Sequence, residues 1–317
     1  MRGTVMNLYF GIFRSFYFLA GTFVNMFPRL SLTLYNRALN IYLKKGLNYN
    51  FVEILLDLAV NLDILGKTPE AVQSYKRVLE INPNEARAYY GLAIIHDDSR
   101  EFEKAIEYYK KSVELDPYYS KAYFFMANAY DESGKKTEAA SCYEHAAELD
   151  PTHFWAFNNL AAVYEELGQY DKALAAIRKG LELEPEHFKA LFNAGVIMNR
   201  LGYRNKAIAY YEQSMDINPR YPYTYLNLSL IYTEDKDYQK AVEVISKGIK
   251  FAPEASFLLY NRACFHVNLQ NYELALKDLI CAADMSRDLE EYMKTDEELD
   301  PLRGLGTYKE RFGVSVQ

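Results

Sequence analysis

The sequence predicts an all-α fold, a solenoid of stacked antiparallel helix pairs, because one segment of 34 residues recurs along most of the chain. The stretch Ala156–Pro185 represents this repeat. Its closing proline recurs at the same spacing, at Pro83, Pro117, Pro151, Pro185, Pro219 and Pro253. An alanine recurs in the same way, at Ala71, Ala105, Ala139, Ala173, Ala207, Ala241 and Ala275. Since one such repeat cannot bury its own apolar face, the copies are expected to stack on one another.

Composition narrows the class of protein. The chain of 317 residues is 50% hydrophobic and 25% charged, as expected of a folded soluble protein. Its net charge of -7 repels phosphate, so we expect no nucleic-acid partner. The three cysteines, Cys142, Cys264 and Cys281, lack CxxC spacing and fall within expected helices, which predicts buried reduced thiols and a cytoplasmic location.

Residues 1–50 form the first element, which is apolar and basic. The first 52 residues hold six basic residues and no acidic one, a net charge of +6. Because the whole chain has a net charge of -7, the remaining residues carry a net charge of -13. The basic residues are Arg2, Arg14, Arg29, Arg37, Lys44 and Lys45. This segment therefore differs in electrostatic character from the repeats that follow it.

The run Val5–Phe27 has a narrow polar stripe at helical spacing and a wide aromatic face. A membrane span is marginal because Arg14 at its middle would cost about 2.5 to 3.5 kcal/mol, and a signal peptide is disfavoured because the run lacks small residues at its end. Two interpretations stay open. Residues 1–28 contact a membrane surface as an amphipathic helix, or the helix pairs with Leu30–Leu43 to form a degenerate first repeat.

Residues 51–286 contain seven predicted helix pairs. Four first helices end at a glycine, which supplies the left-handed residue of a helix end: Gly66, Gly134, Gly168 and Gly202. Each first helix also carries a small residue, and these are Ala59, Ala93, Ala127, Ala161, Gly195, Ser229 and Ala263. They are expected to meet the recurring alanines of the second helices, while tyrosines fill the gap to the next pair: Tyr75, Tyr109, Tyr143 and Tyr211.

This pattern resembles the tetratricopeptide repeat family from residue 51 to residue 286. In one repeat the matching residues are Phe157, Leu160, Ala161, Tyr164, Gly168, Tyr170, Ala173, Gly180 and Pro185. The resemblance implies a right-handed superhelix whose first helices line a concave face. Arg287 replaces the last expected proline, and Lys236 and Gln270 replace the turn glycine, which puts the geometry of those turns in question. Residues 287–317 resemble the polar segment that caps many such arrays.

No pattern in the chain predicts catalysis. The five histidines are scattered over different repeats without metal-ligand spacing: His96, His145, His153, His187 and His266. The sequence has no glycine-rich phosphate loop and no GxSxG motif. We therefore expect no enzyme activity, no cofactor and no metal.

An asparagine stands two places before the small residue of the first helix in four consecutive repeats, at Asn159, Asn193, Asn227 and Asn261. An amide both donates and accepts hydrogen bonds, so such a row could pair with the backbone of an extended peptide whatever its side chains are. Solvated polar residues are the alternative interpretation. Asparagine costs up to about 0.7 kcal/mol in a helix relative to alanine, which favours a function. The resemblance adds support, because some members of the family hold extended chains in this way.

Aromatic residues flank the asparagine row and are expected to anchor a partner: Trp155, Phe192, Tyr223 and Tyr260. Members that bind the acidic tail of chaperones use further cations. Lys189 matches one of them, but Phe257 and Asn261 stand where a lysine and an arginine are required. Losing two charge-assisted hydrogen bonds of about 1.5 to 3 kcal/mol each disfavours chaperone-tail binding.

The sequence thus predicts a non-enzymatic protein-interaction scaffold that binds an extended peptide or partner segment in a groove. The alternative is a membrane-associated assembly factor or co-chaperone that is anchored through its N-terminal amphipathic helix. An accessory subunit of an enzyme is a third interpretation.

Overall fold

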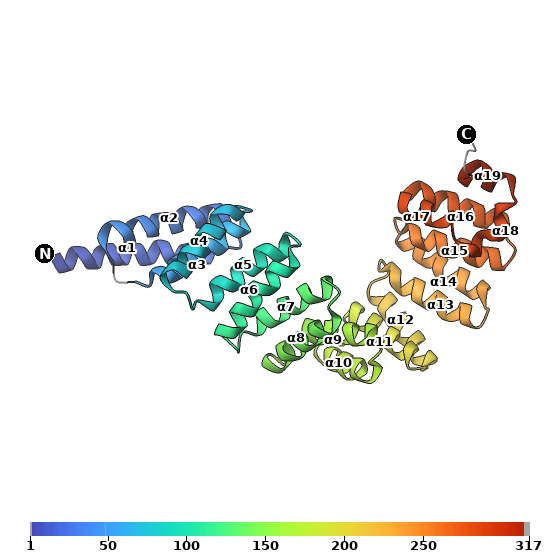
Figure 1. The fold of residues 1–317 in the computed structure, drawn as a ribbon, viewed down its shortest axis with the longest axis horizontal. Coiled ribbons are helices and arrows are strands. Elements are labelled where there is room, and N and C mark those ends of the chain that lie inside the picture. Colours follow the sequence, from blue (N-terminus) through green and yellow to red (C-terminus); the bar gives the residue numbers. More distant parts are fainter. Residues whose placement is uncertain (1, 48, 314–317) are drawn as a thin grey trace. The chain divides into compact units, whose positions relative to one another are not determined.

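The computed structural model describes residues 2–47 and 49–313, in which every regular element is a helix (Figure 1). The elements are α1 (Arg2–Phe23), α2 (Pro28–Lys45), α3 (Phe51–Ile64), α4 (Thr68–Ile81), α5 (Ala86–Asp98), α6 (Phe102–Leu115), α7 (Ser120–Glu132), α8 (Lys136–Leu149), α9 (Phe154–Glu166), α10 (Tyr170–Leu183), α11 (Phe188–Arg200), α12 (Arg204–Ile217), α13 (Pro222–Glu234), α14 (Tyr238–Phe251), α15 (Ser256–Asn268), α16 (Tyr272–Met285), α17 (Arg287–Met293), the 3-10 helix η1 (Glu297–Leu299), α18 (Asp300–Arg303) and α19 (Gly306–Phe312). The predicted all-α solenoid is confirmed.

Small residues let the two helices of a pair approach closely. The recurring alanines of the second helices, from Ala71 to Ala275, are all fully buried, as is Ala93 on a first helix. At Gly195 a Cβ atom would lie only 2.6 Å from Cε1 of Tyr211. The tyrosine ring is itself buried, so it occupies the space that the small residue leaves open.

The turns between the helices of a pair share one conformation. At Gly134 and Gly202 the backbone is left-handed, with φ of 76° and 78°. Where the sequence lacks the glycine, Arg100, Lys236 and Gln270 adopt φ of 58°, 60° and 59°. The departures from the repeat pattern therefore leave the turn geometry intact and place an ordinary residue in a region that disfavours side chains.

The chain forms two compact units, Met1–Ala156 (unit 1) and Phe157–Gln317 (unit 2). In unit 1, α1 packs against α2, and both contact α3 through a core that includes Phe13, Tyr35 and Ile54. Within the part of the chain that the structure describes, no helix has the length and apolar character needed to cross a bilayer.

In unit 2, the segment from α17 to α19 covers the last helix pair. Leu299, Leu302 and Phe312 are buried against α15 and α16. Arg311 fixes the segment from outside, because its guanidinium pairs with Asp284 at 2.9 Å and with Glu290 at 2.6 Å. The apolar face of the final pair is thereby closed.

The cysteines correct one expectation. Cys142 and Cys264 are buried, and burial raises the pKa of each thiol to about 12. Cys281 is also a free thiol on a helix, but it is exposed, so the prediction that it is buried was wrong. Leu279 and Ala282 are buried on the side of α16 that packs against the core, so Cys281 lies on the solvent-facing side of the helix.

Candidate functional site

The four asparagines of the predicted row lie in unit 2, at the same place on α9, α11, α13 and α15. The residues are Asn159, Asn193, Asn227 and Asn261, and each is half-buried. Two of these helices, α13 and α15, contact each other directly. The amides are thus neither sealed inside the fold nor fully surrounded by water.

Two of the amides are anchored to their own helices. The Nδ2 group of Asn227 donates to the carbonyl of Tyr223 at 2.9 Å, and that of Asn261 donates to the carbonyl of Phe257 at 2.8 Å. Among the described residues, the side-chain oxygen of neither asparagine accepts a hydrogen bond. Each therefore presents an acceptor with a fixed direction, which suits an N–H group of a ligand.

A fifth asparagine, Asn158, extends the row and was missed from the sequence. Its side chain is only 4% exposed. Asn158 Nδ2 donates to Asn159 Oδ1 at 3.1 Å, and Asn158 Oδ1 accepts from Asn193 Nδ2 at 3.1 Å. This chain of amides links α9 to α11. The sequence did contain a signal for it, since Asn158 is a polar residue at a repeat position that Phe192 and Leu226 fill with apolar side chains in the next two repeats.

Aromatic rings run beside the amides in unit 2. Phe192 meets Tyr221 edge-on at 5.3 Å between centroids, and Tyr221 lies 5.4 Å from Tyr223. Tyr223 in turn stacks on Phe257 at 5.2 Å and is 48% exposed. Tyr221, which the sequence did not single out, connects the predicted anchors Phe192 and Tyr223 into one row.

Tyr260 and Asn261 line a polar cavity of about 620 Å³ at the C-terminal end of unit 2. The Tyr260 hydroxyl donates to Asp296, and its ring packs edge-on against Tyr292 at 5.7 Å. Burial, reinforced by the Asp296 contact, raises the pKa of Tyr260. Tyr260 is therefore already engaged by the C-terminal segment, whereas its neighbour Asn261 faces the cavity.

The remaining predicted partner residues lie at helix N-termini. Lys189 is exposed near the start of α11. Trp155 is 40% exposed at the start of α9, where its ring meets Phe154 at 5.1 Å, and it belongs to unit 1. The structure thus gathers Phe192, Tyr223 and the amides in unit 2.

The described residues hold no group of three histidine, cysteine, aspartate or glutamate side chains that could bind a metal ion. His187 and His266 have pKa values lowered by burial. The chemistry that the amide and aromatic rows offer is hydrogen bonding and apolar contact.

Comparisons with known proteins agree with this architecture. Models described as tetratricopeptide repeat match residues 64–97, 86–119, 120–153, 142–175, 188–221 and 222–254. A comparison with curated proteins found no match.

Solved structures share the fold. A tetratricopeptide repeat protein from Parabacteroides merdae is 18% identical with a TM-score of 0.62, over 77% of this chain and 97% of that one. YrrB, a TPR protein with an unusual peptide-binding site, is 24% identical with a TM-score of 0.52, over 60% of this chain and 98% of that one. The Cut9–Hcn1 hetero-tetramer of APC/C is 17% identical with a TM-score of 0.57, over 88% of this chain and 52% of that one. The repeat fold is that of a protein-interaction scaffold, and the chain belongs to the tetratricopeptide repeat family.

Proposed function

We propose that this chain is a non-enzymatic scaffold that binds an extended polypeptide segment along the first helices of unit 2. The observation that carries the proposal is the row of half-buried amides at one register on α9, α11, α13 and α15. Asn227 and Asn261 each keep an oxygen available as an acceptor, because their NH2 groups are bonded to their own helices. An extended chain presents backbone N–H groups at regular intervals, so it is a suitable partner for such a row.

The aromatic row supports the same partner. Phe192, Tyr221, Tyr223 and Phe257 contact one another, so their rings are held in place before a partner arrives. Rigid aromatic side chains give large apolar contact at a low cost in conformational entropy. Phe257 also fills a position where chaperone-tail binders need a cation, which favours an apolar rather than an acidic ligand segment.

Peptide binding can be tested with the full-length chain. Peptides of 12 residues are selected from a random display library, and their affinity is measured by fluorescence anisotropy. The double variant Asn193→Ala/Asn227→Ala is expected to bind about 5- to 100-fold more weakly, since two hydrogen bonds worth about 0.5 to 1.5 kcal/mol each are lost. The control is Asn205→Ala on α12, an exposed asparagine outside the row. Equal loss in both variants, or no loss in either, contradicts the proposal.

A second candidate function is peripheral membrane association through α1, and one observation favours it. Leu8, Ile12 and Leu19 are exposed along one face of α1, on the side away from the core residue Phe13. This apolar face belongs to a segment with basic residues and no acidic ones, as expected of a helix that lies on anionic lipid. The free thiols of the chain are consistent with a reducing, cytoplasmic location.

Vesicle co-sedimentation tests this candidate. The full-length chain is expected to pellet with vesicles that contain anionic lipid more than with neutral vesicles. The triple variant Leu8→Gln/Ile12→Gln/Leu19→Gln should then stay in the supernatant. The control Leu115→Gln changes an exposed leucine of α6 and should sediment like the original chain. Failure of the original chain to pellet removes this candidate.

A further inference from the structure

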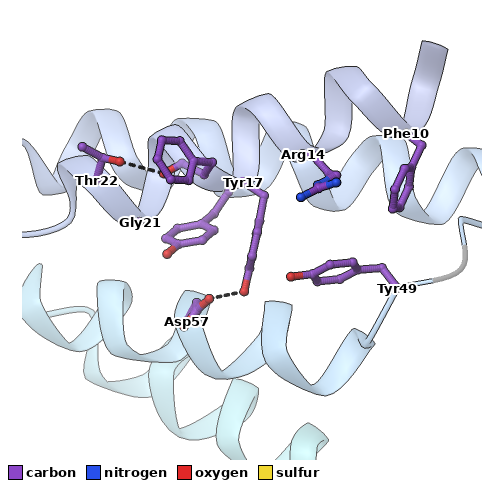
Figure 2. Close-up of a pocket in the computed structure, with 9 residues that line it drawn as sticks. Phe10, Arg14, Tyr17, Gly21, Thr22, Tyr49 and Asp57 are labelled. Atoms are coloured by element: carbon purple, nitrogen blue, oxygen red, sulfur yellow. Dashed lines mark hydrogen bonds between the residues drawn. The ribbon is translucent and has the colours of Figure 1, made fainter. Parts of the chain in front are cut away.

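Unit 1 contains a second hollow, separate from the amide row. It is a cavity of about 600 Å³ lined by residues of α1, α2 and α3 and of the connection between α2 and α3, shown in Figure 2. Its walls are mainly aromatic and include Phe10, Tyr17, Tyr35 and Tyr49. The Tyr17 ring meets Tyr49 edge-on at 5.3 Å and Tyr35 at 5.7 Å, so these rings hold one another in place. The size and apolar lining are those of a ligand site.

The carboxylate in this cavity already has a partner. The Tyr17 hydroxyl donates to Oδ2 of Asp57, as the dashed line in Figure 2 shows. Burial raises the pKa of Asp57. Arg87 on α5 is the cation whose charge acts on Asp57, but it forms ion pairs with Glu53 at 2.8 Å and with Glu85 at 2.7 Å. Asp57 is therefore a structural link between α1 and α3, and it is a poor attractor for a cationic ligand.

The cation in the cavity has no such partner. Arg14 is exposed and has no hydrogen bond or ion pair among the described residues, and its guanidinium carbon lies 5.9 Å from the centroid of the Phe10 ring. Figure 2 places its guanidinium beside Phe10, on the side of α1 that faces Tyr49. Asp57 lines the same cavity, but its carboxylate is hydrogen-bonded to Tyr17 and forms no ion pair with Arg14. An unpaired guanidinium next to apolar walls favours a carboxylate that is attached to an apolar group.

We infer that this cavity binds the C-terminal residue of a partner polypeptide, with its large apolar side chain among the tyrosines and its free carboxylate on Arg14. The cavity has room for one or two residues of a chain end. The inference goes beyond the proposed function, because it concerns unit 1 and recognises a chain terminus rather than a backbone. Its failure would leave the amide row of unit 2 untouched.

The test uses the full-length chain and a labelled peptide, Gly-Ser-Gly-Ser-Leu-Phe, made with a free C-terminal carboxylate or with a C-terminal amide. The free acid is expected to bind saturably and the amide about 10-fold more weakly, because the amide forfeits the charge-assisted bond. Arg14→Gln should weaken the free acid by the same factor and leave the amide unchanged. Arg29→Gln, which alters an exposed cation of α2 outside the cavity, is the matched control.

A second variant fills the cavity without touching Arg14. Gly21 lines the hollow, and a Cβ atom there would lie 3.5 Å from the Tyr35 hydroxyl, so a longer side chain enters the binding space. Gly21→Leu should abolish binding and keep or raise the melting temperature, since leucine favours helix over glycine. Gly11→Leu is the control, because nothing lies within 4 Å of that site.

Three results would overturn the inference. They are equal affinity for acid and amide, unchanged binding by Gly21→Leu, and binding of dodecanoate in place of the peptide. The last result would assign the cavity to a free apolar acid instead of a chain end.

Discussion

Two turns of unit 2 place an ordinary residue where the repeat calls for glycine. Lys236 and Gln270 have φ of 60° and 59°, and both are exposed, so their side chains make no buried contacts that a substitution would remove. A left-handed backbone costs an L-residue about 1 to 2 kcal/mol. Glycine removes that cost but gives the unfolded chain more freedom, worth about 0.4 to 1 kcal/mol. We therefore expect Lys236→Gly and Gln270→Gly each to stabilise the protein by about 0.5 to 1 kcal/mol.

Urea unfolding followed by circular dichroism at 222 nm measures this gain, as a higher midpoint at an unchanged slope. The reverse change, Gly202→Lys, imposes the same strain on a turn with φ of 78° and should lower stability by about 1 kcal/mol. Lys247→Gly, an exposed position inside α14, should also destabilise, because glycine weakens a helix interior by about 1 kcal/mol. If glycine lowers stability at Lys236 and Gln270 as well, the argument from backbone strain is wrong.

Three further changes test other parts of the fold. Asn61 is fully buried, and neither of its amide atoms is hydrogen-bonded among the described residues. Asn61→Ile should therefore raise the free energy of unfolding by about 1 to 3 kcal/mol, and a lower free energy of unfolding would contradict this reasoning. Burial lowers the pKa of His266 below 6.5, so the folded protein binds its proton less readily than the unfolded chain and stability falls as the pH drops below 6.5. His266→Phe should reduce that acid sensitivity in urea titrations at pH 7 and pH 5, whereas exposed His145→Phe should not. Asn158→Leu should leave the free energy of unfolding within about 1 kcal/mol but weaken peptide binding, because it removes both amide contacts that orient Asn159 and Asn193. Unchanged affinity would mean that Asn158 has no positioning role.

Much of the fold could be predicted from the sequence because the same pattern of small and large apolar residues recurs in every repeat. The recurring alanines and tyrosines marked the buried faces, and the structure confirms the helix pairs that they predicted. The turns at Lys236 and Gln270 could not be predicted, since neither residue type favours the left-handed backbone that both adopt there.

The candidate site was less accessible to sequence reasoning. The spacing of the repeats correctly placed Asn193 and Asn227 at the same position of their helices. It could not show which amide groups already form hydrogen bonds within the protein, such as those of Asn193 with Asn158 and of Asn227 with the Tyr223 carbonyl. Tyr260 has the spacing of an anchor, yet it is held by Asp296, which lies 36 residues later in a segment outside the repeats. Contacts between the repeats and non-repeating segments, such as that of Tyr17 with Asp57, follow from tertiary structure alone.

The amide row is most directly tested by removing backbone donors from a ligand. Two selected peptides of unrelated sequence are each compared with analogues in which one backbone N–H at a time is replaced by an ester oxygen, and anisotropy titrations give the affinities. If the amide row reads the backbone, ester positions in register with Asn227 and Asn261 weaken both peptides several-fold, and the Asn193→Ala/Asn227→Ala variant loses affinity for both. Ester substitution that leaves both affinities unchanged, while side-chain changes in the peptides abolish them, would contradict the proposed reading of the backbone.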